Sequence, residues 1–182
     1  NAFENFLDLI LLLERQRESL RLQITFANRT EKFKTITELF KSTPGINEIW
    51  GCIIVAEIGD FGRFPNADTI EFWAGLTPDN ELSAGKAREG KITKAGSATL
   101  RWALGKAAIV LCRSDRTQEK NRQRILKSTE KKAKANVAMA RRLLRILFAM
   151  ARDQKPYTLG EPSNHQARAN QVRLKKQPRK IA

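Results

Sequence analysis

The strongest constraint on the fold is an uninterrupted stretch, residues 3–41, that contains neither proline nor glycine. Its apolar positions recur at steps of three and four residues, with Arg17 as an interruption, and they are Phe6, Ile10, Leu13, Leu20, Ile24 and Ala27. This spacing predicts a long amphipathic helix. We interpret residues 1–41 as a coiled-coil arm that joins copies as a dimer or tetramer. The alternative is a helix that packs on its own domain.

Helix signals continue after this stretch, and no repeat or convincing strand interrupts them. The run Ser42-Thr43-Pro44-Gly45 ends the first helix. Further helices are expected over residues 49–58, 67–74, 98–113, 115–127 and 136–152, with a basic loop over 78–96 and Ser97 as a helix cap. The predicted fold class is therefore all-α, with a compact helical domain over residues 42–157 and a basic, disordered tail over 158–182.

The positive charge of the chain is concentrated in its last part. Residues 113–182 carry 20 Lys and Arg against 5 Asp and Glu, which accounts for the whole formal net charge of +15. Such a segment favours a polyanion, and nucleic acid suits it better than a membrane surface because no aromatic-rich interfacial face accompanies the charge. The candidate nucleic-acid contacts are Arg122, Arg124, Lys131, Lys132, Lys134, Arg141, Arg142 and Arg145.

The sequence lacks the residues for a Cys/His zinc site or a Ser–His dyad. Cys52 and Cys112 lie in apolar runs without metal-ligand spacing, and the single histidine, His165, lies in the polar tail. We therefore expect reduced thiols, a cytoplasmic location, and no metal or cofactor bound by this chain alone. No apolar run, Leu9–Leu13 included, is long enough to span a membrane. Because the chain begins without methionine, we expect it to be a fragment of a longer protein.

The turn after the first helix is a candidate phosphate site. Thr43–Phe61 places a Pro-Gly turn before a helix start, an arrangement that can aim backbone N–H groups at phosphate as in a helix-hairpin-helix. The candidate residues are Pro44, Gly45, Ile46 and Asn47. The alternative is an ordinary helix–helix turn in which Gly45 supplies a positive φ.

The loop NELSAGKAREGKITKAG, residues 80–96, is a second candidate site. Its glycines permit close backbone approach, its cations could neutralise a phosphate, and Ser83 could act as a nucleophile. Local chemistry alone favours a solvated hydroxyl, because no obvious general base lies nearby. The candidates for holding the scissile phosphate are Gly85, Lys86, Arg88, Lys94 and Arg101.

The order of the motifs along the chain indicates a function more specifically than either candidate site does. The run PGI…AEIGDFGRF…WAGLTP…LSAGKAREGKITKAGSATLRWAL…AAI, continued by ANVAMARRLLRILFAMARDQKPY, resembles the C-terminal domain of IS110-type transposases, a family that includes the Piv-type DNA invertases. The resemblance implies a DNA recombinase, often guided by a structured RNA. It also implies that Ser83 attacks a DNA phosphodiester, leaving a phosphoserine link and a free 3′ hydroxyl.

The resemblance further implies a composite site, in which an upstream RuvC-like domain binds Mg²⁺ through four acidic residues. Leu82 and Ala84 depart from the family pattern without affecting the nucleophile. The acidic residues of the arm have the spacing of a solvated helix face, and they are Glu4, Asp8, Glu14 and Glu18. We therefore expect this chain alone not to cut DNA. The alternatives are a non-catalytic helix-hairpin-helix module of a repair or recombination protein, and a helical protein-interaction domain.

Overall fold

The structure is a computed structural model. It describes the backbone of residues 1–27, 31–83 and 86–160 and the side chains of 1–26, 33–78 and 92–160. Its helices, besides a short 3-10 turn at Phe61–Arg63, are α1 (Ala2–Ala27), α2 (Glu31–Lys41), α3 (Glu48–Ile58), α4 (Ala67–Trp73), α5 (Ala98–Ser114), α6 (Arg116–Thr129) and α7 (Lys132–Asp153). The predicted all-α class is confirmed, with one small exception, a β-hairpin between α4 and α5.

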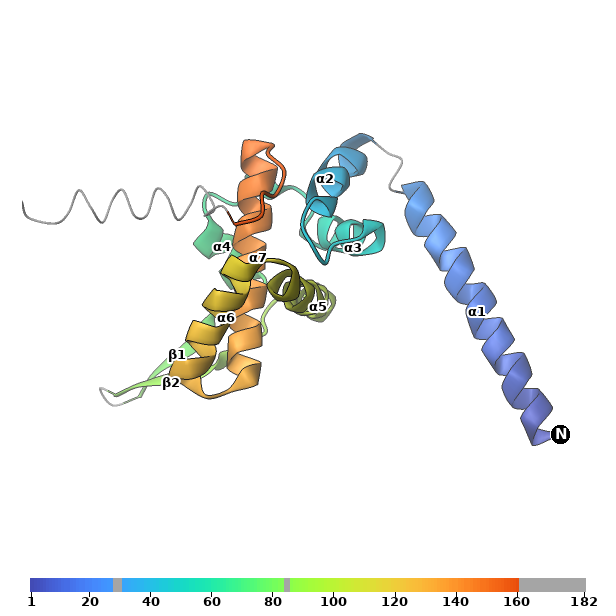
Figure 1. The fold of residues 1–182 in the computed structure, drawn as a ribbon, viewed down its shortest axis with the longest axis horizontal. Coiled ribbons are helices and arrows are strands. Elements are labelled where there is room, and N and C mark those ends of the chain that lie inside the picture. Colours follow the sequence, from blue (N-terminus) through green and yellow to red (C-terminus); the bar gives the residue numbers. More distant parts are fainter. Residues whose placement is uncertain (28–30, 84–85, 161–182) are drawn as a thin grey trace, which may run out of the picture.

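Helix α7 is the centre of the compact part of the molecule (Figure 1). It contacts α2, α4, α5 and α6, and α5 in turn contacts α3. Leucines from α5 and α7 are fully buried between these helices, and they are Leu100, Leu104, Leu111, Leu143, Leu144 and Leu147. Burial of this apolar area supplies the main stabilisation of the domain.

The stretch for which the sequence predicted one long helix contains two, α1 and α2. Helix α2 packs on α3 and α7, with Thr37 and Phe40 fully buried. Helix α1 extends away from the compact part (Figure 1). Most of its large apolar side chains are exposed. The apolar period is the same along both helices, so it could not show that only α2 belongs to the core.

Local caps set the other helix boundaries close to their predicted positions. The Ser97 hydroxyl accepts a hydrogen bond from the Leu100 amide at 3.2 Å at the start of α5. The side chains of Asn47 and Asn66 accept in the same way from Trp50 and Thr69 at the starts of α3 and α4. Short polar side chains at these positions satisfy amides that the first helical turn leaves free.

The prediction of a loop without strands over residues 78–96 was wrong. Strand β1 (Pro78–Ser83) pairs antiparallel with β2 (Lys86–Ile92), and the register has an irregularity between Pro78 and Asn80. The sequence concealed the hairpin because Asn, Asp, Glu, Lys and Gly are uncommon in strands and no clean apolar alternation is present. None of the helices in the described ranges is long and apolar enough to cross a bilayer.

Candidate functional site

Ser83 is the last residue of β1, at the end of the strand that leads to β2. The strand register pairs Ser83 with Lys86 and Glu81 with Arg88. Directly opposed residues of an antiparallel pair have Cα atoms about 5 Å apart. The hairpin therefore brings two predicted cationic positions, Lys86 and Arg88, beside the predicted nucleophile. The side chains of these four residues, and Gly85 as a whole, lie outside the described residues.

Two glycines form the root of this hairpin. Gly75 has φ +67°, and a Cβ there would lie 2.6 Å from the amide nitrogen of Ala95. A Cβ on Gly96 would collide with the carbonyl oxygen of Trp73. The Thr93 amide donates to the Thr77 carbonyl at 3.1 Å, and the Lys94 amide donates to the Gly75 carbonyl at 3.2 Å. The two ends of the hairpin are thus held backbone against backbone.

Arg101, in the first turn of α5, joins both sides of this root. Its Nη1 donates to the carbonyl oxygens of Ala74 at 3.3 Å and Gly96 at 2.5 Å. The structure thereby gives Arg101 a role in holding the hairpin, and its predicted phosphate contact stays a prediction. Lys94 lies at the same root, exposed, with φ +55°.

The turn between α2 and α3 packs against α5. Gly45 has φ +94°, and a Cβ there would lie 2.5 Å from the Ala107 carbonyl oxygen. Ile46 is 5% exposed, and the Asn47 side chain caps α3 through the Trp50 amide at 2.9 Å. These contacts favour the ordinary helix–helix turn for this segment. Phosphate binding by Pro44 and its neighbours stays a prediction.

Arginines of α7 pair with a buried carboxylate on α4. Arg145 donates to Glu71 through both Nε and Nη2, the latter at 2.9 Å, and to Asp68 at 2.5 Å. Arg141 lies 3.6 Å from Glu71, whose side chain is 2% exposed. Burial raises the pKa of Glu71, opposed by Arg145 and Arg141. Arg141 and Arg145, predicted as nucleic-acid contacts, thus have partners within the fold.

A second buried network joins the segment that follows α7 to the start of α6. The Asp115 carboxylate accepts from the Tyr157 hydroxyl at 2.5 Å, the Gly160 amide at 3.1 Å and the Thr117 amide at 2.7 Å. Burial acts to raise the pKa of Asp115, but these hydrogen bonds lower it below its usual value. Arg142 joins the network because its Nε donates to Gln118 at 2.6 Å, and Gln118 donates to the Tyr157 hydroxyl at 3.3 Å.

Comparison with known proteins finds a family that matches the middle of the chain. A model of the transposase IS116/IS110/IS902 family matches residues 37–124, from the middle of α2 into α6. Residues 37–124 thus match a transposase domain of this family.

Two relatives extend the likeness beyond the matched span. The 43.6 kDa protein of insertion element IS110 from Streptomyces coelicolor is 26% identical over 150 residues, which is 81% of this chain and 36% of the relative. The putative transposase y4pF/y4sB of Sinorhizobium fredii is 29% identical over 163 residues, which is 85% of this chain and 42% of the relative. The chain thus spans well under half of either relative.

The matched span of the transposase domain includes the hairpin and its root. It does not include α7, although α7 is the packing centre of the domain. The sequence reasoning missed Arg113 and Arg116, which line a groove of about 620 Å³ between α5, α6 and α7 together with Arg122. The high density of basic residues over 113–182 is the signal that could have identified these two arginines. Arg122 is also paired with Glu119 at 2.8 Å.

The remaining predicted contacts of the transposase domain lie on its surface. The exposed residues are Arg124, Lys131, Lys132 and Lys134. Such side chains can reach a nucleic-acid backbone without rearrangement of the fold. Binding of nucleic acid by these four residues stays a prediction.

The described part of the transposase domain does not fit a divalent metal ion. It contains no group of three or more His, Cys, Asp or Glu side chains placed to hold one. The neighbouring carboxylates of Asp68 and Glu71 already share the Arg145 guanidinium. Cys52 and Cys112 are free thiols, and burial raises the pKa of both, that of Cys112 to about 11.

Proposed function

We propose that this chain is the serine-bearing, nucleic-acid-binding part of a DNA transposase or site-specific recombinase. The observation that carries the proposal is the position of Ser83 at the end of a hairpin whose root is clamped, within a transposase domain. A serine presented in this way can reach a strand held outside the helical core. The clamped root limits its freedom once the strand is bound.

In the proposed reaction the Ser83 oxygen attacks the phosphorus of a DNA phosphodiester. A bond forms between this oxygen and phosphorus, and the bond from phosphorus to the 3′ oxygen breaks. The serine proton passes to a base, and the leaving oxygen gains a proton to become a free 3′ hydroxyl. Lys86, paired with Ser83 in the register, and Arg88 would neutralise charge on the phosphate.

The whole protein would supply the metal ligands and the partners that the described residues do not provide alone. Because the described residues do not fit a metal ion, acidic ligands for Mg²⁺ would come from another part of the longer protein. We also propose a structured RNA guide as a partner, which exposed cations such as Lys131 and Arg124 would contact. The exposed apolar side chains of α1 support assembly of copies through this helix.

The experiment uses the full-length protein with guide RNA, Mg²⁺ and a DNA substrate that traps the covalent intermediate. Wild type should give a protein–DNA adduct on a denaturing gel, and Ser83→Ala should give none. The control is Ser128→Ala, because Ser128 is exposed at the end of α6 and its hydroxyl donates to the Ile125 carbonyl of its own helix. If Ser83→Ala forms the adduct at the wild-type level, the assignment is wrong. If no protein forms one, the non-catalytic binding module is favoured.

A further inference from the structure

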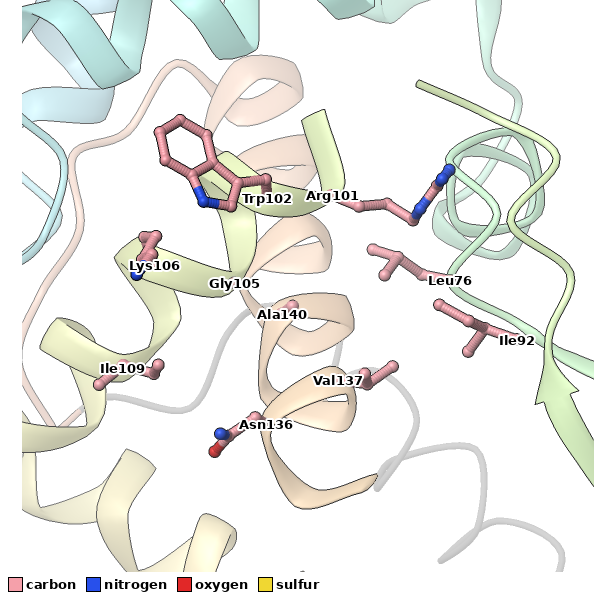
Figure 2. A pocket seen from close by; sticks show the side chains of 10 residues that line it. All are labelled: Leu76, Ile92, Arg101, Trp102, Gly105, Lys106, Ile109, Asn136, Val137 and Ala140. Carbon is pink, nitrogen blue, oxygen red and sulfur yellow. The ribbon is translucent and has the colours of Figure 1, made fainter. Parts of the chain in front are cut away.

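An open cavity of about 330 Å³ lies where α5 and α7 meet the root of the hairpin (Figure 2). Its lining is mostly apolar, and the aliphatic side chains are Leu76, Ile92, Ile109, Val137 and Ala140. The polar lining residues are Arg101, Lys106 and Asn136, and none of the described residues that line the cavity is acidic. An apolar space bordered by cations suits a flat ring carried on an anionic chain.

Trp102 provides an exposed aromatic face at this cavity. It is 55% exposed, although Trp is among the most costly side chains to leave in water. Its ring packs against Trp50 of α3 with centroids 4.8 Å apart and an interplanar angle of 62°. The contact with Trp50 restrains Trp102 while leaving much of its indole open. Exposed aromatic side chains on a basic domain are the usual platforms on which bases of single strands stack.

Gly105 keeps the cavity open. It lies inside α5, where Ala would favour the helix, and a Cβ placed on it meets nothing within 4 Å. By contrast, a Cβ on Gly51 of α3 would lie 2.8 Å from Thr37, so close helix packing explains that glycine. No neighbour among the described residues requires Gly105 to lack a side chain. The space beside it is part of the cavity.

We propose that this cavity binds an unpaired nucleobase of the nucleic acid that the domain holds. Trp102 stacks on the base, and Asn136 offers both a donor and an acceptor to the edge of the base. Lys106 contacts the adjoining phosphate. The inference rests on the proposed function, since it requires that the domain binds nucleic acid.

The cavity has a defined place relative to Ser83. Ile92 lines the cavity and pairs with Pro78 at the start of β1, and Ser83 lies five residues along that strand. At a strand rise of about 3.3 Å per residue, the separation is roughly 16 Å. This corresponds to about five nucleotides at the spacing of one strand of B-form DNA. The unpaired base would therefore lie about five positions from the bond attacked by Ser83.

The test compares two labelled single strands of equal length and charge by fluorescence anisotropy. One is oligothymidylate, and the other carries abasic spacers at every position. The wild-type chain should bind oligothymidylate at least about fivefold more tightly, the smallest effect expected for one stacked base. Trp102→Ala should bind both strands with the affinity of the abasic one. Phe72→Ala is the control, because Phe72 is an exposed aromatic residue of α4 outside the cavity.

Gly105→Leu separates loss of the cavity from loss of the fold. The substitution favours the helix and fills the space, so the base preference should disappear while the melting temperature does not fall. An oligouridylate arm distinguishes the source of the base, since tighter binding of that strand than of oligothymidylate would assign the cavity to RNA.

Two results would overturn the inference while leaving the proposed function intact. One is equal wild-type affinity for the base-bearing and abasic strands. The other is a base preference that survives both Trp102→Ala and Gly105→Leu, with a change in sedimentation instead, which would assign the cavity to a second copy. If the wild type binds neither strand, the proposed nucleic-acid function itself fails.

Discussion

A Cβ atom on Gly75 would lie 2.9 Å from the amide nitrogen of Gly96, so the two ends of the β-hairpin are in direct backbone contact. Arg101 hydrogen-bonds to carbonyls on both sides of the same contact. The hairpin that carries Ser83 therefore leaves the core from a closed root. Its direction is set by the backbone of Gly75 and Gly96 as well as by strand pairing.

Gly96→Ala should open this root. The added Cβ would collide with the carbonyl oxygen of Trp73, which belongs to the backbone and cannot move aside cheaply. We expect a loss of about 1–3 kcal/mol in the free energy of unfolding, measured by urea denaturation. The matched control is Gly105→Ala, where the Cβ meets open space and stability should stay equal or rise. Equal stability of Gly96→Ala and wild type would contradict the closed root.

Arg145→Ala should be among the most destabilising substitutions on α7. It leaves the Glu71 carboxylate buried with only the more distant Arg141 nearby, and we expect a loss of about 3–5 kcal/mol. Replacing both partners, as Arg145→Met with Glu71→Leu, should recover most of that loss. Arg152→Ala serves as the control, because Arg152 pairs with Asp153 at the surface. Chemical denaturation of the wild type and these three variants measures the losses, and a mild effect of Arg145→Ala would exclude a buried pair.

Tyr157→Phe should destabilise the domain in a pH-dependent manner. Asp115 has a lowered pKa, so its hydrogen bonds add stability above its ordinary pKa of about 3.9, and this is lost as the pH falls through the lowered value. Removing the Tyr157 hydroxyl takes away one donor to the ionised carboxylate and should cost about 1.5–3 kcal/mol at pH 7. The difference from wild type should shrink in acid. Urea unfolding at pH 7 and below pH 3 measures it, and a difference independent of pH would exclude the charged acceptor.

Exposed apolar side chains on α1 should drive self-association. Ile10, Leu13 and Leu20 are between 42% and 58% exposed on a helix that contacts α3. Changing all three to Asp should shift sedimentation from an oligomer to a monomer without loss of the core, because they lie outside the hydrophobic core cluster. A monomeric wild type would rule out the arm as an assembly element.

The sequence predicted the features that depend on neighbouring residues. Ser97 and the turn after Ser42 set helix ends through local hydrogen bonds, so they could be identified directly. The pair between Arg145 and Glu71 joins residues 74 positions apart, and charge patterns do not show which arginines turn inward. For the same reason the sequence predicts Arg141, Arg142 and Arg145 as nucleic-acid contacts, although each has a partner within the fold. The hairpin was missed because its strands are polar, and Ser83 was identified by resemblance to a family rather than by its local chemistry.

The most direct test of the central claim is to locate the covalent bond. The adduct between the full-length protein and its DNA substrate is digested with protease and nuclease, and the phosphorylated peptide is sequenced by mass spectrometry. We predict the modification on Ser83, in the peptide that joins β1 to β2. A nucleotide-derived phosphate attached to any other residue would contradict the account.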